Sequence, residues 1–127
     1  MEKAKEAQKY GKVKGIIWHQ GSSDTGRLDV YLDYLNQMVT DMRKDLGDPN
    51  IPFIAGELMP STEPRIAWNN MIHGISERVS DSAWVSADGL SCFDVTTHFD
   101  TKSQRILGQR YAKAMLKMAY NIEIDAP

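Results

Sequence analysis

The chain has 127 residues, of which 42% are hydrophobic and 25% charged, and its formal net charge is -2 at pH 7. This is the composition of one ordinary globular domain. The 15 lysines and arginines are scattered, so no nucleic-acid partner is predicted. No apolar run is long enough to span a membrane, and the single cysteine excludes an internal disulfide.

The first predicted element is a helix over residues 2–10, which are polar and have high helix propensity. Because this segment has no apolar core, it is not a signal peptide. A secreted or periplasmic parent that has lost its signal stays compatible with the sequence, so the localisation is left open. A short apolar run over residues 13–18 then predicts a buried strand.

Helices and strands continue to alternate along the rest of the chain. Helices are predicted over residues 28–46, 64–79 and 101–120, and strands over 51–55 and 83–87. Thr101 with Gln104 three residues later predicts a capping box for the last helix. The alternation favours an α/β fold with a parallel sheet. Because such a sheet usually has about five or six strands, we expect residues 1–127 to be the C-terminal portion of one larger domain, incomplete at its N-terminus.

Polar clusters follow the predicted strands, at the sheet edge where α/β domains bind ligands. His98, in the loop over residues 88–99, is a candidate general base. Asp94, four residues earlier, is the first candidate for the acid that would orient it, and Asp88 and Asp100 remain alternatives. The other interpretation is a surface histidine among solvated aspartates.

The loop over residues 19–26 offers a second candidate cluster, which we expect to face the same cleft as His98. The amide of Gln20 suits a developing oxyanion, and Gly21 allows close backbone approach to a ligand. A plain polar turn is the alternative, and His19 is equally ambiguous. His73 is expected on a helix surface. No metal-ligand spacing and no cofactor-binding motif is present.

Two segments resemble the sialate O-acetylesterase and acetylxylan esterase family of SGNH hydrolases, carbohydrate esterase family six. The family carries K-G-x-x-W-H-Q-G-E-S-D, and residues 14–24 read K-G-I-I-W-H-Q-G-S-S-D. Near its end the family has H-F-D, S-Q-R and L-G-x-R-Y-A, which match residues 98–100, 103–105 and 107–112. The family stretch D-x-R-x-D-L matches residues 41–46. The resemblance covers nearly the whole chain.

The resemblance implies a flavodoxin-like three-layer α/β/α fold and a Ser-His-Asp site that removes acetyl groups from carbohydrates without a cofactor. His98 would be its general base, Asp94 the orienting acid, and Gln20 would contribute to the oxyanion hole beside Gly21.

The sequence departs from the family pattern in three ways. The nucleophile motif G-Q-S-N-M does not occur in the printed sequence. Ser22 occupies the position of the glutamate in H-Q-G-E, and a hydroxyl cannot supply that charge. The family aspartate, three residues before the histidine, is Val95 here, and Asp94 lies one residue further away. A bulge in the loop would absorb that slip.

The leading hypothesis is therefore a fragment of a sugar O-acetylesterase that carries the base and the oxyanion side of the site and is inactive alone. Its partner would be an acetylated carbohydrate. The rival is a vestigial, non-catalytic module that binds carbohydrate. A weaker alternative is a small domain that self-associates through an exposed sheet edge.

Overall fold

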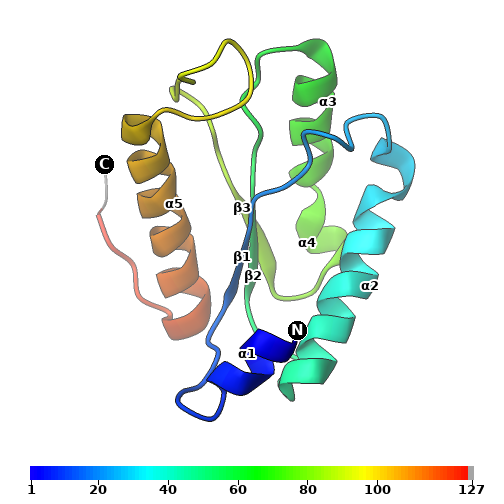
Figure 1. Cartoon of the computed structure of the whole chain (residues 1–127), viewed down its shortest axis with the longest axis vertical. Helices are drawn as coiled ribbons and strands as arrows, with labels where there is room; N and C mark the ends of the chain where they lie inside the picture. Colours follow the sequence, from blue (N-terminus) through cyan, green and yellow to red (C-terminus); the bar gives the residue numbers. More distant parts are fainter. Residues whose placement is uncertain (126–127) are drawn as a thin grey trace.

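Within residues 1–125, which the computed structural model describes, three parallel strands form the centre of the molecule and helices cover both faces (Figure 1). The strands are β1 (Ile16–Trp18), β2 (Phe53–Gly56) and β3 (Ser82–Val85), in the order β1-β2-β3. Both pairs, β1 with β2 and β2 with β3, are parallel. The predicted α/β fold with parallel strands is confirmed.

The helices form one layer on each side of the sheet. They are α1 (Glu2–Ala7), α2 (Leu28–Leu46), α3 (Glu63–Ile72), α4 (Ile75–Arg78) and α5 (Thr101–Tyr120). Figure 1 shows α2, α3 and α4 on one side and α5 on the other. Of the helices within residues 1–125, none combines the length and the apolar character needed to cross a bilayer.

The central strand β2 divides the hydrophobic core into two parts, because successive side chains of a strand point to opposite faces. Phe53 and Ala55 pack in a cluster with residues of α2, α3 and α4. Ile54 packs in the other cluster, which includes Leu107 and Tyr111 of α5. Every residue of β2 is buried. Helices therefore pack on both faces of the sheet. This packing positions the loops that follow the carboxyl ends of the strands.

Several helices and strands are shorter than predicted. The helix predicted over residues 64–79 is two helices, with a break at His73 and Gly74. Glycine lowers helix propensity by about 1 kcal/mol relative to alanine, which explains the break. The strand predicted over residues 13–18 pairs only from Ile16, which lies opposite Phe53 at the start of β2.

The predicted capping box of the last helix was wrong. The N-cap of α5 is Asp100, whose Oδ1 accepts a hydrogen bond from the Ser103 N–H at 2.7 Å. Gln104 instead donates to the Phe99 carbonyl at 2.9 Å. Aspartate is preferred over threonine at this position, so Asp100 takes the cap and the helix begins at Thr101.

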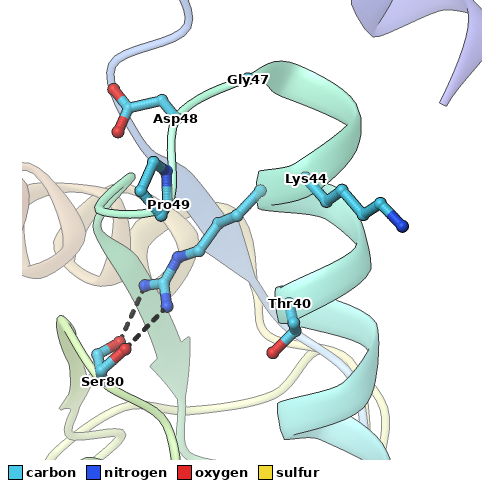
Figure 2. A pocket seen from close by; sticks show the side chains of 7 residues that line it. Thr40, Lys44, Gly47, Asp48, Pro49 and Ser80 are labelled. Atoms are coloured by element: carbon cyan, nitrogen blue, oxygen red, sulfur yellow. Dashed lines mark hydrogen bonds between the residues drawn. The ribbon is translucent and has the colours of Figure 1, made fainter.

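Arg43 fastens the amino ends of β2 and β3 to α2. Its side chain is buried, and its Nε and Nη2 donate to the Ile51 carbonyl at 3.0 and 2.8 Å. Its Nη2 also donates to the Ser80 carbonyl at 2.8 Å. An adjoining cavity of about 530 Å³ is lined in part by Thr40, Lys44 and Ser80. Figure 2 shows the side chains of these lining residues. This cavity is larger than the one beside His98 but lies at the opposite end of the sheet, and its arginine is already bound to carbonyls.

Replacing Arg43 with methionine should lower the free energy of unfolding by about 2–4 kcal/mol, because buried carbonyls lose their charged donor. Denaturant unfolding monitored by circular dichroism measures this change. The matched control is Lys44→Met in the same helical turn, where the side chain is exposed and the change should stay within about 0.5 kcal/mol. Equal stability of the two variants would contradict the fastening role of Arg43.

Candidate active site

His98 and Asp94 form a directly bonded pair in the loop before α5. The His98 Nδ1 lies 2.5 Å from the Asp94 Oδ2. The other carboxylate oxygen, Oδ1, accepts the backbone N–H groups of Thr97 and His98, both at 2.8 Å. The loop therefore folds around the Asp94 carboxylate.

The electrostatics of the pair suit a general base. The backbone N–H groups of His98 and Thr97, followed by the His98 ring, hold the pKa of Asp94 well below its usual range. An ionised Asp94 can only accept hydrogen bonds, so Nδ1 of His98 carries the proton. With Nδ1 as the donor to Asp94, Nε2 is the nitrogen that can accept a proton. The side chain of His98 is 68% exposed, which leaves this nitrogen accessible.

The two alternative acids serve other purposes. Asp100 caps α5 and accepts a hydrogen bond from the Ser91 hydroxyl at 2.5 Å. Asp88 is exposed, and its backbone N–H donates to the Ser86 hydroxyl at 2.9 Å. Among the three candidates that the sequence left open, the structure brings only Asp94 to His98.

Phe93 is a feature of the site that sequence reasoning missed. Its ring stacks on the His98 ring with centroids 5.7 Å apart and an angle of 20°. The Phe93 N–H donates to the His98 carbonyl at 3.0 Å. An aromatic residue five positions before a histidine carries no signal by itself, because the stacking depends on how the loop folds back. Phe93 limits the orientations that the imidazole can adopt.

The three loops that follow the strands meet at one edge of the sheet, as expected. His19 packs edge-on against Phe99 with ring centroids 5.6 Å apart. The Ser61 hydroxyl donates to the Thr96 carbonyl at 2.9 Å. A cavity of about 340 Å³ opens at this edge, lined by His19, His98 and residues of α5.

Gln20 does not share that cavity with His98. Its Oε1 accepts the Tyr31 hydroxyl at 2.8 Å, and its Nε2 donates to the Asp24 Oδ2 at 2.6 Å. It lines a separate cavity of about 400 Å³ against α2, together with Trp18. The expected common cleft for Gln20 and His98 is therefore not formed. Tyr31 and Asp24 hold the amide on the α2 side of the sheet.

Gly21 is required for close packing. It is buried with a φ of +145°, and a Cβ at this position would lie 2.1 Å from Cζ2 of Trp68. The sequence analysis expected a ligand at the Gly21 backbone, whereas the group that packs against it in the structure is a core tryptophan.

The adjoining serines, Ser22 and Ser23, lie apart from the histidine hydrogen bonds of the site. Ser22 and Ser23 are exposed in a turn, and in residues 1–125 neither hydroxyl has a hydrogen bond to a histidine. Residues 1–125 also contain no group of three His, Cys, Asp or Glu side chains placed to hold a metal ion. The chemistry available at this edge is proton transfer by imidazole.

Glu57 is a second acidic residue that the sequence analysis did not single out. It lies directly after β2, buried, and accepts the Ala87 N–H at 2.7 Å and the Ser86 hydroxyl at 3.0 Å. Its other oxygen lies 2.5 Å from Nε2 of His73, whose ring stacks on Trp84. His73 is exposed as expected, but it is bonded to Glu57. This network joins the end of β2 to the start of the loop that carries His98.

Comparison with known proteins identifies the family. The family model described as "Carbohydrate esterase, sialic acid-specific acetylesterase" matches residues 1–117. The chain belongs to this family of carbohydrate esterases. The resemblance found in the sequence motifs is thereby confirmed at the level of the family.

Two proteins are similar to this chain in sequence or in fold. The probable carbohydrate esterase At4g34215 of Arabidopsis thaliana is 26% identical over 127 residues, covering 91% of this chain and 45% of that protein. Its X-ray structure superposes with a TM-score of 0.80 at 23% identity, over 92% of this chain and 50% of the other. XAC1771, a carbohydrate acetylesterase from Xanthomonas citri, superposes with a TM-score of 0.68 at 22% identity, over 87% and 27%. The esterase-family chain thus spans about half the length of the curated relative.

Proposed function

We propose that this chain carries the general-base side of a carbohydrate O-acetylesterase, with an O-acetylated sugar such as a sialic acid as substrate. The observation that carries the proposal is the His98–Asp94 contact of 2.5 Å in a member of an acetylesterase family. His98 Nε2 would take the proton of a serine hydroxyl as it attacks the acetyl carbonyl, and would return it to the departing sugar oxygen.

The nucleophile of this proposed SGNH-type site would come from a segment outside the printed sequence. No G-Q-S-N-M motif occurs among the 127 residues, and within residues 1–125 neither Ser22 nor Ser23 has a hydrogen bond to His98. Without a serine to activate, the acyl-enzyme route is closed. The isolated chain would then bind an acetyl ester without hydrolysing it at an enzymatic rate.

Gln20 would still donate a hydrogen bond to the oxyanion, the role expected for it from the sequence analysis. A side-chain amide has two N–H donors, and the structure commits one of them to Asp24. The second N–H has no hydrogen-bond acceptor within residues 1–125. Tyr31 fixes which end of the amide carries the nitrogen, because its hydroxyl donates to Oε1.

A second candidate function is a non-catalytic module that binds carbohydrate or associates with itself. It is favoured by Ser22, which replaces the charged residue of the family motif. It is also favoured by β1, which pairs only with β2 within residues 1–125 and leaves Ile17 62% exposed beside its open edge. An open edge of this kind invites association with another chain.

The test uses the gene segment directly upstream of this chain. The chain is produced with that upstream segment, and acetate release is measured from O-acetylated sialic acid and from acetylated xylan. Release that depends on a serine in a G-Q-S-N motif would support the esterase. An extended protein that binds either sugar but releases no acetate would favour the non-catalytic module. A dimer formed by the unextended chain would favour self-association.

A further inference from the structure

His19 is a second histidine at the cavity beside His98, and it has no part in the proposed proton transfer. It directly follows β1, and its ring packs against Phe99 on the α5 side of the sheet. It lines the same cavity as His98 and Thr97, with its outer side exposed. A ligand that occupies this cavity therefore lies beside both His98 and His19.

The protein fixes which nitrogen of His19 carries a proton. The Tyr111 hydroxyl donates its only proton to the Trp18 carbonyl, at 2.8 Å, because a carbonyl can only accept. The contact between the same hydroxyl oxygen and the His19 Nδ1, at 3.2 Å, must then be donated by His19. Burial lowers the pKa of His19 from its ordinary value of 6.5, so the ring is neutral at pH 7. Its Nε2 is therefore a lone-pair acceptor.

The contact between His19 and Tyr111 is built into the packing of three elements. Tyr111 is buried in α5, and its ring lies edge-on to His19 with centroids 6.5 Å apart. Gly56, at the end of β2, leaves the space for both groups. A Cβ at Gly56 would lie 2.1 Å from the Tyr111 Oη and 2.7 Å from the His19 Nδ1. The orientation of His19 thus depends on a buried tyrosine and a glycine, as expected for a prearranged group.

We propose that His19 is a substrate-binding residue that accepts, at Nε2, a hydrogen bond from a free hydroxyl group of the sugar in the cavity shared with His98. The proposal rests on the proposed function, which supplies the sugar. No protein donor reaches this nitrogen among residues 1–125. A neutral acceptor selects hydroxyl donors rather than anions or carbonyl groups, and sugars are rich in hydroxyl groups. His19 would then bind a free hydroxyl group near the ester, while His98 transfers the proton.

The first test is the tautomer of His19 in the unliganded 127-residue chain. Imidazole ¹⁵N chemical shifts at pH 7 should show Nδ1 protonated and Nε2 unprotonated. Tyr111→Phe keeps the packing but removes the hydroxyl acceptor, so the protonated fraction of Nδ1 should fall. His73, whose Nε2 faces Glu57 instead, is the internal reference and should not change. A His19 ring protonated at Nε2 in the unaltered chain would overturn the proposal.

The second test is titration of the same chain with N-acetylneuraminic acid and, separately, with methyl α-glucoside. The Nε2 shift of His19 should move saturably with at least one of these sugars. His19→Phe should weaken that sugar's affinity about fivefold, the effect of losing one neutral hydrogen bond. His73→Phe, an equal change outside the cavity, should leave the affinity unaltered.

The remaining outcomes separate this proposal from the proposed function. If a sugar moves the His98 signals but leaves His19 unchanged, the His19 proposal fails and the esterase assignment stands. If neither histidine responds to either sugar, the His19 proposal again fails. The esterase assignment is then decided independently by acetate release from the upstream-extended protein.

Discussion

Replacing His98 with alanine should lower kcat/KM for an acetylated sugar by about 10⁵–10⁶-fold in the upstream-extended protein, since loss of the base costs nearly as much as loss of a whole triad. The physical reason is that the serine hydroxyl would have no acceptor for its proton, and the departing sugar oxygen would have no donor. Acetate release at pH 7 measures the effect.

The matched control for this variant is His73→Ala. His73 is also exposed and also bonded to a carboxylate, but its partner Glu57 belongs to a different network. Its replacement should change kcat/KM less than about threefold, because it has no role in the proton transfer. A His98→Ala protein that retains the unaltered rate would remove the central residue of the proposed mechanism.

Asp94→Asn should lower kcat/KM of the extended protein by about 10³–10⁴-fold, a smaller loss than that of His98→Ala. Asparagine can still accept the backbone N–H groups of Thr97 and His98, so the loop should keep its shape. Its amide can also donate to Nδ1, which would place the His98 proton on Nε2, where the base must be free. The variant therefore tests the tautomer separately from the fold of the loop.

Asp88→Asn is the control for Asp94→Asn, because Asp88 lies in the same loop region and is exposed. Its kcat/KM should remain unchanged. Equal losses in the two variants would mean that a general charge effect, rather than the bond to His98, sets the rate.

The pH dependence of Asp94 follows from the direction of its shift. Its pKa is lowered in the folded chain, so the carboxylate stabilises the loop above its unfolded pKa, and that stabilisation is lost as the pH falls through the folded value. Asp94 thus stays ionised in mildly acidic solution. A fall in activity in that range would have to come from another group.

The fold and one site contact were predictable because they depend on local signals. Helical spacing from Leu28 to Leu46 and short β-branched runs determine the parallel α/β order. Asp94 lies only four residues before His98, and a carboxylate that accepts neighbouring backbone N–H groups is a local motif.

The parts that sequence could not predict depend on partners distant along the chain. Gln20 is held by Tyr31, which reaches it only because α2 packs beside β1. The tautomer of His19 is set by Tyr111, which lies 92 residues further along the chain. The Glu57 carboxylate contacts His73, which lies in the segment that connects β2 to β3, and Ser86, which directly follows β3. Such contacts follow from packing, which a motif does not encode.

The most direct test of the central claim, that this chain holds the base but not the nucleophile, is reaction with a serine-directed phosphonate. The unextended chain and the upstream-extended protein are treated in parallel, and the labelled peptide is identified by mass spectrometry. We predict no labelled serine in the unextended chain and p-nitrophenyl acetate hydrolysis at a histidine-catalysed background, because the covalent route is absent. The extended protein should be labelled on a serine upstream of this chain. Labelling of Ser22, Ser23 or another serine in the unextended chain, with a burst of hydrolysis, would contradict the account.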